Sequence, residues 1–318
     1  MNRKSTPVAA PAVDPAIAPA NGVTRKGQPL SFNRAPAADL APWIGRFYVT
    51  VVDAPDNYAL QCGLLNDTSC IRIQLRGDWT AQTRDGGIAV GRSALFFGPN
   101  TRRMPIGVKG PFSSVGVVLR PGACHALFRI AVPDLVDRIT PIETVGLASE
   151  KSLGLFTPDA SPEDWCVAME EALRAMIARQ GGHEPDPVTA RFEAAALADP
   201  AILVADFVEQ SGIEQRRLER IVRRDFGITP KHVLRRARAL DMASHLRGVA
   251  DEAEAETLAL RYYDQSHLIR EFTAMFGMSP RQFINTPQPL MTLSLENRQS
   301  RRLEMSERIA PGGLRPWQ

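Results

Sequence analysis

Between about residues 40 and 150, apolar positions recur in short runs that predict β-strands. In the stretch 70–76 the apolar residues alternate with Arg72, Gln74 and Arg76, which is the two-residue period of a strand with one buried and one solvent-facing side. Further short apolar runs, separated by glycine and proline, occur at 48–52, 94–97 and 115–119. Several short strands at this spacing predict a cupin-like β-barrel or a β-sandwich.

After about residue 161 the apolar period becomes that of an α-helix. Ser161 and Pro162 are suited to the N-cap and the first position of a helix. One face of this helix would carry Trp165, Met169, Leu173, Met176 and Ile177. Two interpretations of this apolar stripe stay open, a dimer interface or packing against the strands. Residues 183–187 read as a linker, and nearly everything from 188 to 286 is predicted to be helical.

The helical part contains an internal repeat with an offset of 50 residues. The stretch Phe226–Val233 recurs as Phe276–Phe283. The match extends upstream, where Gln215, Leu218 and Arg220 correspond in turn to Gln265, Leu268 and Arg270. In both copies a glycine is placed to end one helix, and a Thr-Pro or Ser-Pro pair is placed to start the next. One supersecondary unit is therefore predicted to occur twice.

The first copy is rich in arginine on the helix before Gly227. The window 211–250 holds ten Lys and Arg residues against four acids, which leaves a local excess of six positive charges. DNA phosphates favour such a face through counterion release, and arginine can read guanine in the major groove. A short amphipathic helix at 204–210 and the turn Ser211-Gly212-Ile213 precede it, as in a helix-turn-helix. This context favours DNA binding over the alternative of a merely solvated helix face.

The second copy carries the most specific signature. Residues 262–272 and 277–283 resemble the signature of the bacterial AraC/XylS family of transcriptional regulators. The resemblance covers about residues 188–286. It implies an all-α domain of two helix-turn-helix subdomains, joined by one long helix at about Pro230–Arg247. It also implies a sequence-specific DNA-binding transcription factor that reads two adjacent segments of the major groove.

Carried over by position, the resemblance assigns candidate DNA-binding residues to both units. In the first unit these are Gln215, Arg216 and Arg220, with Arg217 and Arg224 expected on phosphates. In the second unit they are Gln265, Ser266 and Arg270. This unit departs from the family pattern at Arg261 and Glu256-Thr257. We therefore expect it to bind DNA more weakly than the first.

The expected fold class is α+β, with the β-rich region acting as a sensor and dimerisation domain with flanking helices. The predicted divisions are a disordered Ala/Pro-rich arm at 1–38, the β-rich domain at 39–182, the DNA-binding domain at 188–286 and a mobile tail at 287–318. The β-rich region resembles the family's sensor domains faintly, which implies a small effector. The alternatives are a protein-interaction module without a ligand and, less favoured, a cupin-type enzyme.

Composition narrows the remaining classes. The chain has 318 residues, 44% of them apolar, and a net charge of +3, as expected for a soluble globular protein. The four cysteines lack metal-ligand spacing and His125 is isolated among the strands, so we expect reduced thiols, no metal and no cofactor. No catalytic constellation is apparent. The expected partners are double-stranded DNA, a second copy of the chain and, for an activator, RNA polymerase, in the cytoplasm on the nucleoid and away from membranes.

Overall fold

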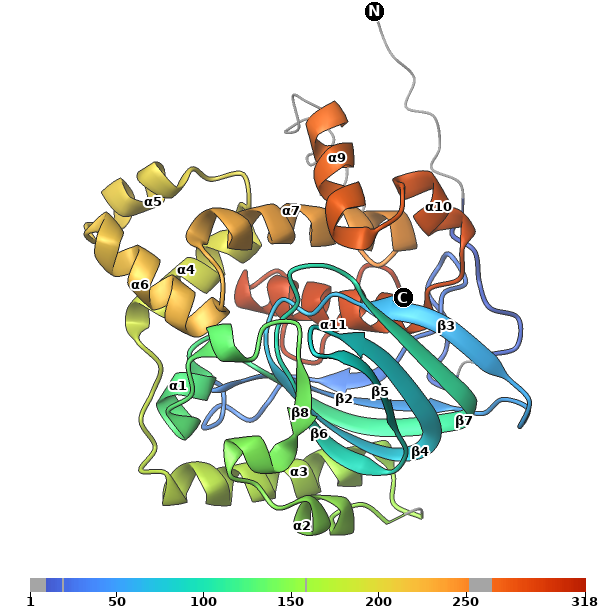
Figure 1. Cartoon of the computed structure of the whole chain (residues 1–318). Helices are drawn as coiled ribbons and strands as arrows, with labels where there is room; N and C mark the ends of the chain where they lie inside the picture. The colour runs from blue at the N-terminus through green and yellow to red at the C-terminus, as the bar shows by residue number, and fades with distance from the viewer. Residues whose placement is uncertain (1–9, 19, 158, 252–264) are drawn as a thin grey trace, which may run out of the picture.

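The computed structural model describes residues 10–18, 20–157, 159–251 and 265–318. An antiparallel sheet and its flanking helices come first, and a helical region follows (Figure 1). This arrangement confirms the predicted α+β class, and each of the four predicted runs lies in a strand. The strands are β1 (Phe32–Arg34), β2 (Ile44–Val52), β3 (Ala59–Leu64), β4 (Cys70–Thr83), β5 (Gly86–Val90), β6 (Ser93–Phe97), β7 (Met104–Leu119) and β8 (Ile139–Pro141).

The sheet curves because its two longest strands change partners along their length. The strand order is β1-β2-β7-β4-β6-β8, while β3 also pairs with β7 and β5 also pairs with β4. In β4 the register shifts between Gln74 and Asp78, around Gly77 with its φ of +99°. Such a bulge bends a strand and increases its twist. The result is a sheet with a convex outer face and a concave inner face.

Both faces of the sheet are covered, and this corrects the prediction for residues 70–76. Ile71 and Ile73 belong to the apolar core on the outer face. Arg72 and Gln74 point to the inner face but are only 7% and 2% exposed. The alternation was recognised correctly and Arg76 is exposed as predicted, but at Arg72 and Gln74 the polar side of the strand lines the interior instead of facing solvent.

Helices α1 (Ala123–Phe128), α2 (Ser149–Gly154) and α3 (Pro162–Arg179) accompany the sheet. Ser161 caps α3 as predicted: its hydroxyl accepts from the Asp164 N–H at 3.2 Å, and the Asp164 carboxylate accepts from the Ser161 N–H at 3.0 Å. The apolar stripe of α3 is buried in the core on the outer face of the sheet. Packing against the strands is therefore correct, and this stripe does not provide a dimer interface.

The predicted disordered arm and mobile tail are both wrong where the structure describes them. Within the arm, β1 forms hydrogen bonds along the edge of β2, and Leu30 and Gln28 are buried. Within the tail, residues Pro289–Met305 form helix α11, which lies over the inner face of the sheet (Figure 1). Buried Trp317 accepts a hydrogen bond from the Arg25 N–H at its carbonyl oxygen, so the end of the tail binds the arm. The first nine residues of the arm lie outside the described ranges.

The remaining helices are α4 (Pro187–Ala198), α5 (Val204–Ser211), α6 (Gln215–Phe226), α7 (Pro230–Arg247), α9 (Gln265–Phe276) and α10 (Pro280–Asn285). Helix α7 has the predicted bounds. Gly227 and Gly277 end α6 and α9 with φ of +79° and +68°, as the repeat predicted. Ser279 starts α10 with a capping box to Gln282.

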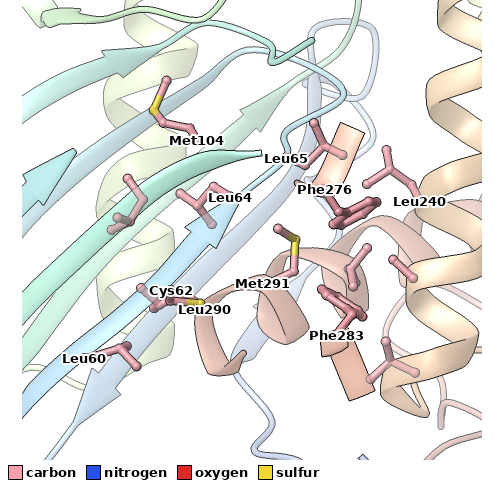
Figure 2. Close-up of a cluster of buried hydrophobic side chains, with 14 of the residues drawn as sticks. Leu60, Cys62, Leu64, Leu65, Met104, Leu240, Phe276, Phe283, Leu290 and Met291 are labelled. Atoms are coloured by element: carbon pink, nitrogen blue, oxygen red, sulfur yellow. The ribbon is translucent and has the colours of Figure 1, made fainter. Parts of the chain in front are cut away.

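One apolar core continues from the sheet into the helical region. It joins side chains of β3 to Leu290 and Met291 of α11 and, beyond them, to Phe283 of α10 and Leu240 of α7. Figure 2 shows this continuity, with Phe276 and Leu65 in the same cluster. Helix α11 is thus the layer between the sheet and the second half of the helical region.

Candidate nucleic-acid interface

The first helical unit is held by its own apolar cluster. Phe192 of α4 contacts the rings of Phe207 on α5 and Phe226 on α6 edge to face, with centroids 5.1 and 5.6 Å apart. Leu218 and Val222 of α6 are fully buried in the same cluster. These residues form the inward face of α6, and the opposite face is left to carry polar groups.

The turn between α5 and α6 exposes the start of α6. Gly212 ends α5 in the left-handed region, with φ of +66°, and Ile213 anchors the turn in the apolar cluster. Gln215, Arg216, Arg217 and Arg220 are exposed, and Gln215 donates to the carboxylate of Glu219 at 2.9 Å. Four backbone N–H groups at a helix start have no partner within the helix, so this end also favours an anion.

Arg224 differs from the other predicted contacts of α6. Its guanidinium donates to both oxygens of the buried Asp225, at 2.6 and 2.7 Å. Asp225 also accepts from Thr189 of α4 at 2.5 Å. Burial and the charge of Arg224 lower the pKa of His125, which lies on α1 of the sheet domain. Arg224 is thus part of the contact between α6 and the sheet domain, and an approach to phosphate would break its ion pair.

The C-terminal end of α6 is docked onto the sheet domain. A side chain at Gly227 would meet Val136 at 2.4 Å and Val132 at 3.1 Å. Val132 belongs to the short 3₁₀ turn Val132–Asp134. Gly227 is therefore required twice, for its positive φ and for this close approach. Contact with the sheet domain is made by the end of α6, while the start of α6 points away.

The positive excess of the first unit is smaller at the surface than the sequence suggested. On α7, Arg236 is buried and donates to the backbone oxygens of Asn100 and Asp67 in the sheet domain, at 2.8 and 2.7 Å. Arg247 is also buried, and its guanidinium contacts residues of the arm, α10 and α11. Burial lowers the pKa of each of these two arginines to about 10. They are structural groups, so the accessible positive face is concentrated on α6.

Among the described side chains, the second unit exposes less positive charge on α9 than the first exposes on α6. Ser266 and Arg270 are exposed on α9, while α9 begins at Gln265. Phe272 and Phe276 of α9 and Phe283 of α10 pack together, with ring centroids 4.2 to 5.4 Å apart. Arg261 and Glu256-Thr257, where the sequence departs from the family pattern, lie outside the described residues.

A buried carboxylate ties the second unit to α7. Glu271 of α9 accepts from Arg235 at 2.8 Å and from Arg238 at 3.3 Å, and its side chain is 3% exposed. These two arginines belong to α7, so they add nothing to the free positive face. Helix α9 is thereby attached to the connecting helix by charge as well as by apolar packing.

Two other features of the described residues bear on the choice of site. Nowhere in those ranges do three or more His, Cys, Asp or Glu side chains gather as they would around a metal ion. Within the same ranges, no helix combines the length and the apolar character that crossing a membrane demands. The four cysteines are buried thiols without disulfides.

Two family models match separate parts of the chain. A family model described as a helix-turn-helix domain matches residues 207–286, and a domain of unknown function matches residues 33–141. No curated protein is significantly similar in sequence. Among solved structures, an apo form of ToxT from Vibrio cholerae is 10% identical, with 80% of this chain and 100% of ToxT covered and a TM-score of 0.44.

Two further solved structures are similar over shorter stretches. The AraC-like transcriptional activator CuxR is 13% identical, with 66% of this chain and 86% of CuxR covered and a TM-score of 0.29. A cupin superfamily protein from Desulfitobacterium hafniense is 13% identical, with 29% and 79% covered and a TM-score of 0.21. The matched model and the paired helical units together identify the C-terminal region as a helix-turn-helix domain.

Proposed function

We propose that this protein is a DNA-binding transcription regulator of the AraC/XylS type, and that it recognises a specific DNA sequence chiefly through the exposed start of α6. Gln215, Arg216 and Arg220 would face base edges, where glutamine pairs with adenine and arginine with guanine. Arg217 would contact phosphate. The exposure of all four side chains, on a helix whose far end is fixed to the sheet domain, is the observation that supports this assignment. Arg224 is left out because its guanidinium is paired with Asp225.

The second unit would read the neighbouring segment of the major groove. Its contacts would come from Gln265, Ser266 and Arg270 on α9. Helix α7 has 18 residues, which at 1.5 Å per residue span about 27 Å. Since successive major grooves lie about 34 Å apart, a rigid spacer of this length suits two recognition helices placed near its two ends. Val233 and Leu234 of α7 support the first unit, and Leu240 and Leu246 support the second.

Selection of bound sequences from random DNA, by the full-length protein at physiological salt, tests this proposal. A single enriched motif with two segments about one helical turn apart is expected. The Gln215→Ala and Arg216→Ala variants should relax the motif at one segment only. Arg92→Ala, which removes an exposed arginine in the sheet domain, is the matched control and should leave the motif unchanged. Equal recovery of all sequences would overturn sequence specificity.

We also propose that the sheet domain modulates DNA binding through a small ligand. The support is a cavity of about 50 Å³ between the inner face of the sheet and α11. A cavity lined by buried polar side chains favours a ligand over a protein-interaction module, for which an exposed apolar patch would be expected. A homodimer on paired half-sites remains part of the proposal, and sedimentation of the protein with and without DNA measures it.

A further inference from the structure

The cavity beneath α11 is lined by an excess of positive charge. Its walls include Arg46 and Arg72 from the sheet, Arg298 and Arg301 from α11, and one carboxylate, Asp67. Arg298 and Arg301 both pair with Asp67, at 3.2 and 3.0 Å, and Arg46 pairs with Glu304 at 2.6 Å. Within the described part of the chain, the structure gives Arg72 no carboxylate partner.

Arg72 is held by aromatic rings instead of by an acid. Its guanidinium carbon lies 5.2 to 5.6 Å from the ring centroids of Tyr48, Trp79 and Phe97. Its Nε donates to the Tyr48 hydroxyl at 3.2 Å, while its Nη1 has no hydrogen-bond partner. Burial raises the pKa of Tyr48 and of Cys70, so both neighbours are neutral at pH 7. Cation–π contacts offset only part of what a buried charge loses on leaving water.

Gly116 leaves the space that allows the Tyr48 ring to reach Arg72. Tyr48, Gly116 and Arg72 lie side by side across β2, β7 and β4. A Cβ at Gly116 would lie 2.1 Å from the Tyr48 ring, so only glycine lets that ring cross β7 toward Arg72. The interior position of Arg72 therefore depends on three strands and is built into the sheet.

Other polar groups of the cavity lack partners as well. Arg46 Nη2, Arg301 Nε and Thr68 Oγ1 are buried without a hydrogen bond. These groups and Arg72 Nη1 can all donate, whereas Asn297 Oδ1 is the unpartnered acceptor on the same walls. An occupant that mainly accepts hydrogen bonds and carries negative charge would satisfy them.

The cavity also limits the size and the shape of its occupant. At about 50 Å³, and with about 10–15 Å³ needed for one water on this scale, it admits roughly three to five groups of water size. Val118, Leu290 and Leu293 supply an apolar wall. A carboxylate with a short carbon chain matches both the donors and this wall.

We propose that the sheet and α11 enclose a binding site for a short-chain carboxylate, with Arg72 as its counter-ion. The inference rests on the proposed ligand control, because the same cavity serves both. Since six lining residues come from α11, including Leu293 and Asn297, the ligand would contact the helix that links the sheet to α7.

Titration calorimetry and thermal melting of the full-length protein test the site directly. Sodium propionate is the probe, propionamide is the neutral isostere, and inorganic phosphate is a second anion, all at constant ionic strength. Saturable binding and a higher Tm with propionate, and neither with propionamide, are expected. Equal behaviour of propionate and propionamide overturns the proposal, and binding of phosphate alone overturns the carboxylate assignment.

Variants separate the role of Arg72 from general effects. Arg72→Gln should weaken propionate binding at least tenfold and raise the Tm without ligand, because it removes an unpaired buried charge. Arg76→Gln on the same strand is the control, since Arg76 is 58% exposed, and it should bind as the wild type does. Ser294→Leu, which fills the cavity from α11, should also abolish binding, so the test stands if Arg72→Gln does not fold. Undiminished binding in these two cavity variants would contradict the site.

DNA binding without ligand is measured separately by gel shift. If the protein binds specific DNA but no carboxylate, only the ligand-site proposal fails. If the protein binds no specific DNA, the DNA-reading proposal fails, and the calorimetric test of the ligand site is unaffected.

Discussion

The two helix-turn-helix units are supported in different ways. The first has its own apolar cluster around Phe192, and its contacts with the sheet domain include the end of α6 together with polar bonds from Glu193 of α4 and Arg236 of α7. The second shares its cluster with α11 and β3 and is tied to α7 through Glu271. A repeated sequence therefore yields one unit with an apolar cluster of its own and one that shares its apolar cluster with the sheet domain and α11.

The largest expected effect comes from removing one phenylalanine from each core. Phe192→Ala and Phe283→Ala should each cost about 3–5 kcal/mol of stability, because both side chains are fully buried. Hydrogen exchange should show where the loss spreads. Phe192→Ala should loosen α4 to α6 only, whereas Phe283→Ala should also loosen α11 and β3. Loss of protection confined to α9 and α10 in Phe283→Ala would show that the cores are not shared.

A smaller effect is expected on DNA affinity. Arg220→Ala should weaken specific binding by about 1–3 kcal/mol if Arg220 contacts a base. Arg270→Ala, at the equivalent position of the repeat, should cost less than about 1 kcal/mol, because the described side chains of α9 expose less positive charge than those of α6. Gel shifts at fixed salt measure both variants. Equal losses would show that the two units contribute equally to DNA affinity. That result would contradict the expectation drawn from the exposed charge on α6 and α9.

The smallest expected effect is a dependence of stability on pH. Although burial opposes it, hydrogen bonds and charge from Arg238 and Arg235 lower the pKa of Glu271 below its ordinary 4.5. The resulting stabilisation is present above about pH 4.5 and is lost as the pH falls through the lowered value. Urea unfolding in a descending pH series should therefore lose less stability for Glu271→Gln than for the wild type. Glu209→Gln, on the exposed side of α5, should follow the wild type.

The helical region was predictable because its signals are local. The end of one helix and the start of the next are specified within a few residues, by Gly227, Thr229 and Pro230. The same signals recur in the second copy at Gly277. The exposed start of α6 followed from the same helical period. These features need no knowledge of distant parts of the chain.

What the sequence did not reveal depends on contacts between distant residues. Helix α11 was taken for a mobile tail because Arg298, Arg301 and Arg302 make it look polar, yet their acidic partners lie on α4, α7 and the loop before β4. Leu290, Leu295 and Leu303 on the same helix were the available signal. Arg72 was assigned to solvent because strand alternation identifies two faces without showing that both are covered.

The position of α11 after the sheet domain and the second unit in chain order has a consequence for biosynthesis. Its leucines complete the inner face of the sheet, and Arg298 links Asp67 of the sheet domain to Asp241 of α7. Because a ribosome synthesises α11 after the sheet domain and the second unit, both emerge before the layer that joins them exists. Apolar surface on β3 stays uncovered during that interval. Chains that end before residue 289 would therefore expose this surface to chaperones and proteases.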